Sequence, residues 1–298
     1  MSENLPAVLQ ANLPTNYADL DQRDFLAATG MGGDELGLGL PSLRVNYDDQ
    51  DNDGNSIPRG QWSLYVDGVK YFAKEVDFRV MYATHQYSHY DASEGMTISQ
   101  STHFNRFGEE VYDTTGGFKC GKVSKKQFEK LSDPEKEVQK KIKLARVLFG
   151  LVSLKGVDVK GQPASLDNTP CVFYARGTNF MPMTELLQEI TKAKQVPQKK
   201  LLKLSLKREK NEGVTYWEVV PAIVNDNVEI TESDYNIIKE FALTVAAENE
   251  TIFAKWKKQR VTSAVEGKGT AALLERDVEL PFNDTVDDLN PDNVLAAG

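Results

Sequence analysis

Residues 201–220 read LLKLSLKREKNEGVTYWEVV and carry the clearest structural signal in this chain. Leucines at alternate positions are separated by polar residues, and a turn sequence at 211–213 leads into a second alternating segment. Successive side chains of a strand point to opposite faces, so the pattern predicts a β-hairpin whose leucine face packs inward. Lys203 and Lys207 are then expected to share the exposed face.

Some segments on either side of this hairpin have the hydrophobic spacing of strands, and others have the spacing of helices. Ser132 or Asp133 is a suitable N-cap ahead of Pro134, which favours the first turn of a helix. Thr184 is the expected N-cap of the following helix. The sequence predicts strands in residues 41–91, 97–111, 146–154 and 171–180, and helices in residues 132–147, 184–194 and 231–259.

This order of elements lacks the strict strand–helix alternation of a parallel sheet. It predicts an α+β fold that is mostly antiparallel β structure, with an OB-like barrel core, inserted helices and a long C-terminal helix. Three parts are expected along the chain. Residues 1–40 form a flexible N-terminal arm, 41–260 an OB-like nucleic-acid-binding domain with helical insertions, and 261–298 an acidic, largely disordered tail.

The chain has a formal net charge of −9, but its charges are segregated. Residues 119–146 contain ten cations and four carboxylates, and residues 192–210 contain eight cations and one carboxylate. After Arg276 the chain has six carboxylates and no cation. A basic middle attracts polyanions, and an acidic end is typical of a separate interaction segment.

Composition and motifs narrow the class of protein. The 298 residues are 40% hydrophobic and 27% charged, which is ordinary for a globular protein. The apolar runs are too short to cross a bilayer, the first residues do not resemble a signal peptide, and the two cysteines are far apart. These features favour the cytoplasm, of either a microbe or a host cell. The common catalytic and phosphate-loop motifs are absent, so we expect no enzyme and no cofactor.

Two groups of residues raise the question of a metal ion. Residues 48–55, DDQDNDGN, match the start of a calcium loop, but the bidentate Glu that ends such a loop is missing, and an acidic turn is the better interpretation. His85, His89, His103 and Cys120 could in principle ligate zinc. In a strand the first two histidines would stand about 13 Å apart, which disfavours a shared ion.

The basic and aromatic residues of the middle favour contact with single-stranded nucleic acid, because cations neutralise phosphates and flat rings stack on any base. Tyr174 and Arg176 share a face of their predicted strand, as do lysines and one aromatic residue of the hairpin. The alternative is that Tyr174 and Trp217 belong to the core, and that the lysines only keep the sheet edge soluble. The candidate binding residues are Lys203, Lys207, Arg208, Lys210, Tyr174, Arg176, Trp217, Tyr216, Tyr82, Tyr87, Lys119 and Lys122.

The chain resembles the single-stranded DNA-binding proteins encoded by bacteriophages. The resemblance rests on the segments RVLFGLVSL, PCVFYARGTNF and KLSLKREKNEGVTYWEVVP, followed by the acidic LPFNDTVDDLNPD, and covers the architecture of residues 40–295. It implies an OB-type core that protects single-stranded DNA without sequence preference during replication and recombination. It also implies a tail that contacts replisome or recombination proteins, or competes for the DNA groove. The aromatic residue that often ends such tails is absent, although Phe282 could take its place.

Two other classes of protein fit parts of the same pattern. A non-catalytic virion structural or assembly protein would share the strand-rich body and the acidic turns, but would lack salt-dependent retention on single-stranded DNA. A nucleic-acid-processing enzyme would require a divalent metal ion. The sequence leaves open the choice between DNA and RNA, the oligomeric state, and whether the protein anneals strands or only coats them.

The charge segregation generates one prediction. Truncation after Arg276 removes six carboxylates and no cation, so it should strengthen binding to single-stranded DNA at low salt. The gain should shrink as salt rises, because screening weakens tail and DNA contacts alike. Fluorescence anisotropy of the full-length and truncated proteins across a salt series measures the difference. Equal affinities at low salt would show that the tail does not mask the binding surface.

Overall fold

The computed structural model describes residues 39–51, 54–91, 96–211 and 213–265. The chain divides into two units, residues 1–41 and 42–298, and every strand and helix below belongs to the second unit. Residues 1–38 of the predicted arm, and the predicted tail beyond residue 265, lie outside the described residues.

The described residues form a nine-stranded sheet and four helices. The strands are β1 (Ser42–Val45), β2 (Trp62–Val66), β3 (Val69–Ala73), β4 (Glu75–Asp91), β5 (Met96–Gln100), β6 (Ile142–Asp158), β7 (Pro163–Arg176), β8 (Leu201–Asn211) and β9 (Val214–Asn225). The helices are α3 (Lys125–Phe128), α4 (Asp133–Lys141), α5 (Phe180–Lys192) and α6 (Glu232–Val265), with short 3-10 turns η3 (Lys119–Gly121), η4 (Gly177–Asn179) and η5 (Pro197–Lys199).

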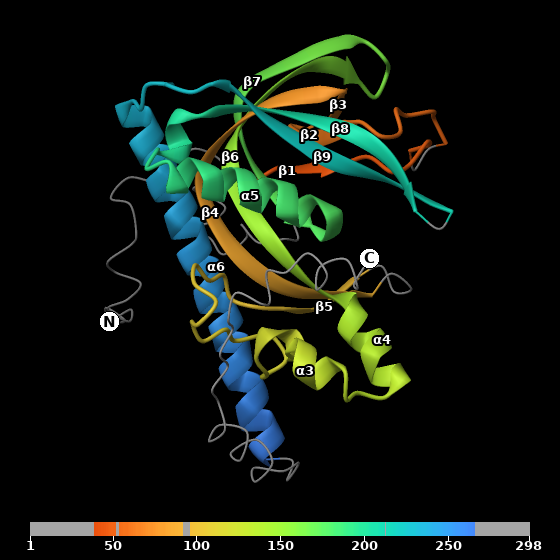
Figure 1. The fold of residues 1–298 in the computed structure, drawn as a ribbon, viewed down its shortest axis with the longest axis vertical. Helices are drawn as coiled ribbons and strands as arrows, with labels where there is room; N and C mark the ends of the chain where they lie inside the picture. The colour runs from red at the N-terminus through yellow and green to blue at the C-terminus, as the bar shows by residue number, and fades with distance from the viewer. Residues whose placement is uncertain (1–38, 52–53, 92–95, 212, 266–298) are drawn as a thin grey trace, which may run out of the picture. The chain divides into compact units, whose positions relative to one another are not determined.

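Five strands close into a barrel in the order β1-β2-β3-β6-β7 (Figure 1). Neighbouring strands are antiparallel except β7 and β1, which are parallel and join at Ser42↔Val172 and Leu43↔Phe173. The strands follow one another around the ring in chain order. The predicted α+β class with a barrel core, inserted helices and a C-terminal helix is therefore confirmed.

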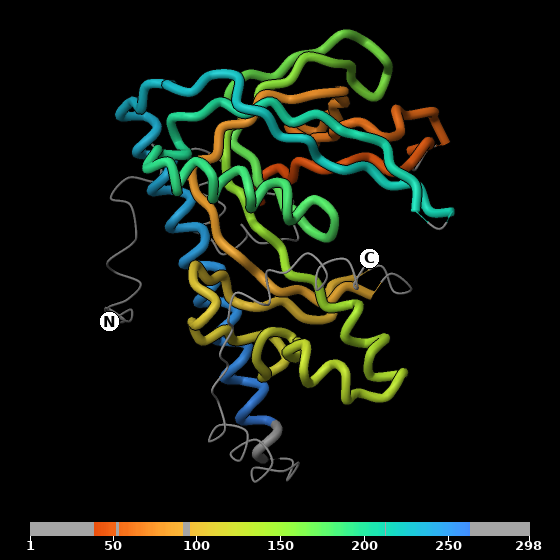
Figure 2. The backbone as a smooth tube through the Cα atoms, viewed as in Figure 1, coloured from red at the N-terminus to blue at the C-terminus, as the bar shows by residue number. Residues whose placement is uncertain are grey.

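The two longest strands, β4 and β6, have 17 residues each and extend well beyond the barrel (Figure 2). They pair from Val76↔Leu154 to His89↔Ile142, with one irregularity. Lys74 alone separates β3 from β4, so one nearly continuous strand leaves the barrel beside β6. At the other edge of β4, the β8–β9 hairpin pairs with its first residues and β5 pairs with its last.

The barrel core holds the hairpin in place. Trp62 is fully buried, contacts Phe173 edge-to-face at 5.3 Å, and donates its indole N–H to the Leu204 carbonyl over 2.9 Å. Met183 and Leu187 of α5 are buried in the same cluster. Burial of large apolar side chains is the main stabilising contribution to such a core. The hairpin and α5 are thus parts of the barrel domain rather than appendages.

The local signals for α4 are borne out at one end only. Ser132 is the N-cap, Pro134 lies in the first turn, and the Ser132 backbone N–H donates to Glu135 over 2.8 Å. The helix ends at Lys141, and the prediction that it continues to residue 147 is wrong. Ile142 is buried and begins β6, because its pairing with β4 outweighs the helical spacing of the segment.

Three other expected boundaries are shifted. Helix α5 begins at Phe180 with Asn179 as N-cap, so Thr184 is not the cap but a buried residue inside the helix. Strand β5 ends at Gln100, and only isolated bridges follow in the expected strand. Helix α6 covers the predicted C-terminal helix and continues to Val265, beyond the expected start of the tail.

An ion pair fixes the N-terminal end of α6 to β4. The Arg79 guanidinium donates to both carboxylate oxygens of Asp234, over 3.0 and 3.1 Å, and its Nε donates to the Gln198 carbonyl over 2.7 Å. Both charged residues are buried. Burial raises the pKa of Asp234, but hydrogen bonds from Thr231 and the charge of Arg79 outweigh this effect, so the pKa lies below its ordinary value.

A second polar contact fixes the middle of α6. The buried His103 ring lies 2.8 Å from Thr84 Oγ1 and 3.1 Å from a carboxylate oxygen of Glu248, and Asn249 bonds both backbone groups of His103. Burial raises the pKa of Glu248, but its contacts with His103 and Gln86 lower it below the ordinary value. The helix therefore lies along the sheet at defined positions. In the described part of the chain, no helix is long and apolar enough to cross a membrane.

Removing the ion pair between Arg79 and Asp234 should destabilise the folded protein. Asp234→Asn leaves the Arg79 guanidinium buried without its counter-charge and should lower the free energy of unfolding by about 3–5 kcal/mol at pH 7. Urea denaturation at several pH values measures this loss. The pKa of Asp234 is lower in the folded state, so its contribution exists above the unfolded pKa and disappears as pH falls through the folded value. The difference between wild type and variant should therefore shrink below about pH 4.

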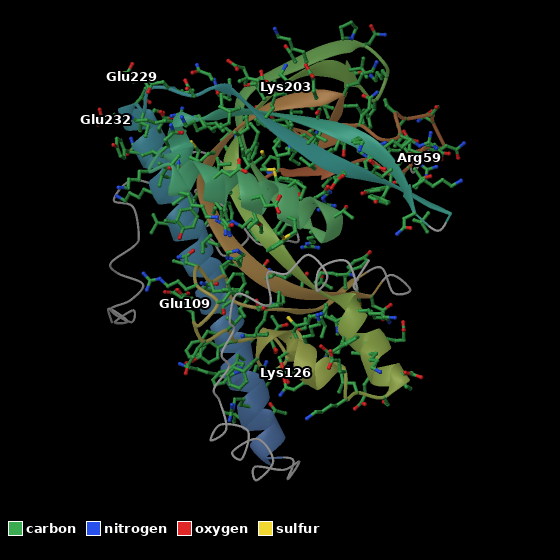
Figure 3. All side chains as sticks on the ribbon, in the orientation of Figure 1. Arg59, Glu109, Lys126, Lys203, Glu229 and Glu232 are labelled. Carbon is green, nitrogen blue, oxygen red and sulfur yellow. The ribbon has the colours of Figure 1, made fainter. Side chains whose placement is uncertain are left out.

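Glu232→Gln is the matched control, because Glu232 is an exposed carboxylate in the same turn of α6 (Figure 3). It should change stability by less than about 0.5 kcal/mol. A loss of similar size in both variants would mean that general charge at the helix N-terminus, rather than the pair with Arg79, stabilises α6.

Candidate nucleic-acid interface

The hairpin of β8 and β9 has the predicted alternation. Leu202 and Leu204 are buried in the barrel core, with 1% and 0% of their surface exposed, and Leu206 packs partly against them. Lys203 and Lys207 lie on the opposite face of the same strand. The inner and outer faces of the hairpin are thus the ones expected from the sequence.

The outer face of the hairpin carries Lys203 and Lys207 together, as expected, but it also carries carboxylates. Lys203 Nζ lies 2.8 Å from a carboxylate oxygen of Glu75, and Lys207 Nζ lies 2.5 Å from one of Glu209. Cross-strand pairing adds Asp77 and Glu218 to this face. Two lysines therefore stand among four carboxylates, and the face has no excess of positive charge to attract a polyanion.

Arg208 and Lys210, which form no ion pair with the residues that the structure describes, lie on the inner face of the hairpin near its turn. Arg208 is the cross-strand partner of Trp217, and Lys210 is the partner of Thr215, so all four side chains share one face. The Arg59 guanidinium lies 5.5 Å from the centre of a Trp217 ring. Arg59, Arg208, Thr215 and Trp217 line a hollow of about 350 Å³. Figure 3 shows Arg59 at this end of the hairpin, away from Lys203.

Trp217 is the buried ring on which the other side chains of this cluster pack, and it is not exposed for stacking. Only 8% of its surface is exposed, and Gly60 lies flat against its indole, so a Cβ at that position would stand 2.3 Å from Nε1. Tyr47 meets Trp217 edge-to-face at 5.4 Å and is 46% exposed. Burial raises the pKa of Tyr47, and a hydrogen bond with the Trp217 backbone partly offsets this. The ring available to a ligand is therefore Tyr47.

A second cationic group lies on the outside of the barrel. The Arg176 guanidinium stands 4.9 Å from the centre of the Tyr174 ring, at the end of β7. Arg44 lies on the neighbouring strand β1. Burial lowers the pKa of Arg176, and the nearby charge of Arg44 lowers it further, while Tyr174 acts in the opposite direction. Two like charges are thus held close together beside a half-buried aromatic ring.

These two groups follow one another along the chain at β1, because Arg44 lies in β1 and Tyr47 lies just beyond its end. The middle of β9 is also tied to η4, which follows β7, since the Val219 backbone N–H donates to Asn179 over 2.8 Å. We call the two groups together the rim surface, which consists of Arg44, Tyr47, Arg59, Tyr174, Arg176, Arg208, Lys210 and Trp217. Among the residues that the structure describes, none of its five cations forms an ion pair. An acidic turn that begins at Asp48 borders the surface at Tyr47.

The other predicted aromatic residues lie elsewhere. Tyr87 is buried and stacks on Phe104 at 5.5 Å, so it is a core residue. Tyr82 is half-buried and packs on Phe149 at 6.1 Å under α6. Tyr216 is half-buried on the acidic outer face of the hairpin. The structure therefore does not bring these three rings to the rim surface.

The predicted lysines outside the hairpin are also separate from the rim surface. Lys122 Nζ donates to the carbonyls of Gln139 and Ile142, over 3.2 and 3.4 Å, and so ties η3 to the end of α4. Lys119 is buried, has a positive φ of 52°, and lines a different cavity beside α6. Lys122 is placed for a structural role, whereas Lys119 belongs to the second cavity.

The histidines and Cys120 do not converge. His85 accepts a hydrogen bond from Arg146 over 2.7 Å, and burial, reinforced by the Arg146 charge, lowers the pKa of His85 to about 3. His103 contacts α6, and the Cys120 thiol lies 3.5 Å from the Tyr87 carbonyl. In the part of the chain that the structure describes, no three His, Cys, Asp or Glu side chains are grouped to hold a metal ion. Asp53 of the acidic turn lies outside that part.

Three residues of the rim surface were missed from the sequence. Arg44, Tyr47 and Arg59 precede the basic middle by more than fifty residues, and no local pattern links them to Trp217. A usable signal was that Arg44 and Arg59 are two of only three cations in the first 60 residues. An isolated cation in an otherwise acidic segment is a candidate for a specific role, because it does not belong to a generally basic surface.

Comparison with protein-family models, curated protein sequences and solved structures finds no match for this chain.

Gly60 generates a prediction about this surface. Gly60→Ala places a methyl group against the Trp217 indole and adopts a φ of +71° that disfavours alanine. Gly68→Ala is the matched control, because its φ is +79° but no atom lies within 4 Å of the added Cβ. Gly60→Ala should therefore cost about 1–3 kcal/mol more stability than Gly68→Ala, measured by urea denaturation. Equal losses would mean that Trp217 is not held against Gly60.

Proposed function

We propose that this chain binds single-stranded DNA without sequence specificity, through the rim surface. The observation that carries the proposal is the pair of arginines on β1 and β7. Arg44 and Arg176 are close enough for one charge to lower the pKa of the other, and neither has a carboxylate partner in the described part of the chain. A backbone phosphate between them would pair with both guanidinium groups, offset part of their positive charge and release counterions.

The remaining residues of the rim surface extend this site along the barrel. Arg59, Arg208 and Lys210 offer further phosphate contacts around the hollow beside Trp217. Tyr47 offers an exposed ring for stacking, and Tyr174 lies beneath Arg176. Stacking and phosphate contacts do not distinguish one base from another, so this combination supports binding without sequence preference.

The same proposal gives the protein a role. It coats and protects single-stranded DNA in the host-cell cytoplasm during phage replication and recombination, and it performs no catalysis. The acidic tail recruits replisome or recombination proteins. Support comes from the resemblance of the sequence to phage single-stranded DNA-binding proteins, the basic middle and acidic end, and the barrel.

Two neighbouring residues on opposite faces of β8 provide the test. Arg208→Gln should weaken binding to a mixed-sequence single-stranded oligonucleotide and reduce the slope of log affinity against log salt by about 0.7, the value for one lost phosphate contact. Lys207→Gln should change neither quantity measurably, since Lys207 is already paired with Glu209. Arg44→Gln and Arg176→Gln should each resemble Arg208→Gln. Fluorescence anisotropy at several salt concentrations measures all four variants.

The controls separate the competing explanations. Absence of any salt-dependent binding by the wild type would end the proposal and favour a virion structural or assembly role. A loss with Lys207→Gln equal to that with Arg208→Gln would move the interface to the outer face of the hairpin. An RNA oligonucleotide of the same sequence establishes whether the preference is for DNA.

A further inference from the structure

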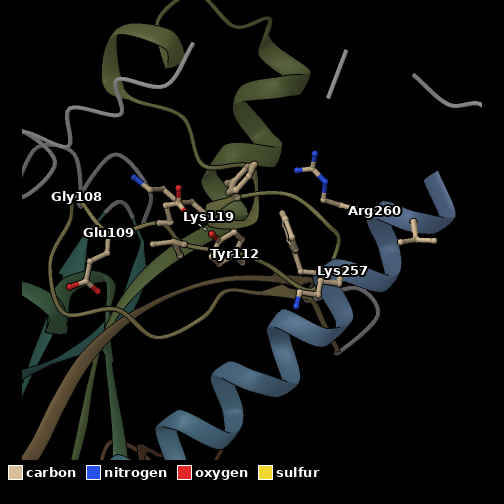
Figure 4. A pocket seen from close by; sticks show the side chains of 11 residues that line it. Gly108, Glu109, Tyr112, Lys119, Lys257 and Arg260 are labelled. Atoms are coloured by element: carbon tan, nitrogen blue, oxygen red, sulfur yellow. Dashed lines mark hydrogen bonds between the residues drawn. The ribbon is translucent and has the colours of Figure 1, made fainter. Parts of the chain in front are cut away.

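A second cavity lies between the segment before η3 and the C-terminal turns of α6 (Figure 4). Its volume is about 810 Å³, within the range of cavities that hold small ligands. Tyr112, Phe118 and Trp256 form its aromatic walls, and Lys119, Lys257 and Arg260 supply cations. None of the residues of the rim surface lines it.

The aromatic walls are packed in fixed orientations. The Trp256 ring lies 4.8 Å from Tyr112 at an interplanar angle of 68°, and 6.0 Å from Phe118 at 59°. Phe253, one turn before Trp256, stacks on it at 5.5 Å and contacts Tyr112 at 4.9 Å. The edge-to-face contacts, together with the stacking of Phe253 on Trp256, hold each ring in place, and Tyr112, Phe118 and Trp256 line the cavity.

Cations from α6 stand directly beside these rings. The Arg260 guanidinium is 4.9 Å from the centre of the Trp256 ring, and Lys257 Nζ is 4.4 Å from the centre of the Phe253 ring. Figure 4 shows Lys257 and Arg260 on one side of the cavity and Glu109 on the other. The cavity thus has the two cations of α6 on one side and aromatic rings in the middle, while the other side carries the carboxylate acceptors and Lys119.

The cations, the aromatic rings and the carboxylates of the cavity are complementary to the phosphate, the base and the exocyclic amine of a nucleotide. We propose that the cavity binds one nucleotide, with its phosphate on Lys257 and Arg260 and its base against the aromatic walls. The carboxylates of Glu109 and Glu110 accept hydrogen bonds from the exocyclic amine of adenine or cytosine. An acidic peptide fits less well, because its several carboxylates would be repelled by the two glutamates that share the cavity.

Isothermal titration calorimetry of the full chain tests the site with three probes: dAMP, deoxyribose 5-phosphate and inorganic phosphate. We expect dAMP to bind at least about tenfold more tightly than either of the others, because only dAMP has a ring to stack. Equal affinities for dAMP and phosphate would overturn the proposal and leave a simple anion site. Binding of an acidic peptide that dAMP does not displace would overturn it in favour of a protein-docking role.

The variants separate packing from recognition. Trp256→Leu should weaken dAMP binding about tenfold, and circular dichroism establishes whether it still folds. Arg260→Gln should weaken both dAMP and deoxyribose 5-phosphate about tenfold, because it removes a cation from the phosphate side while keeping every aromatic ring. Lys258→Gln is the matched control, because Lys258 is an exposed cation in the same turn that does not line the cavity. An equal effect of Lys258→Gln and Arg260→Gln would show that only general charge is involved.

This proposal is independent of the rim surface, and the two can fail separately. Arg208→Gln should leave dAMP affinity unchanged, because Arg208 lies on the hairpin and not in this cavity. If Arg208→Gln weakened dAMP binding as much as Arg260→Gln, the nucleotide would be bound at the rim surface and the cavity proposal would be wrong.

Discussion

The pairing of β4 with β6 is the constraint on which the rest of the structure depends. At one end β6 belongs to the barrel and β4 continues from the barrel strand β3, and beyond the barrel the two strands form a long ribbon that α6 covers on one face. Arg79 and His103 fix the helix to this framework at two separate places. The barrel, the hairpin and the C-terminal helix are therefore attached to the same two backbones, and the geometry of each depends on the register of that one pair.

The two faces of the hairpin differ in charge because successive residues of a strand point to opposite faces. The number of cations in the segment does not show this difference. Adjacent residues in β8 point to opposite faces, so Lys207 meets carboxylates while Arg208 meets an indole. A count of cations treats the two residues as equal, although only one has charge available for a ligand. The acidic net charge of the chain and a local cationic surface are thus compatible, because the carboxylates neutralise one face and leave the other.

Local signals predicted the elements that depend on local physics. The alternation in residues 201–220 and the cap at Ser132 are read within a few residues, and both are present. The closure of the barrel by β1 against β7, and the approach of Tyr47 and Arg59 to Trp217, join residues more than 120 positions apart. No periodicity encodes such contacts. The same limitation made Trp217 a candidate for stacking, although tertiary packing leaves it almost fully buried.

The parallel seam between β1 and β7 has a consequence for the energetics of binding. β1 has four residues and meets β7 at two register pairs, whereas β6 and β7 pair along most of their length. The β1–β7 seam is therefore one of three weakly paired joints of the barrel, together with β1–β2 and β3–β6, and its amide protons should exchange with solvent earlier than those between β6 and β7. Arg44 and Arg176 lie on either side of it. A polyanion bound by both residues would hold β1 and β7 together. Ligand binding would then stabilise the closed barrel, and a closed barrel would bind the ligand more tightly.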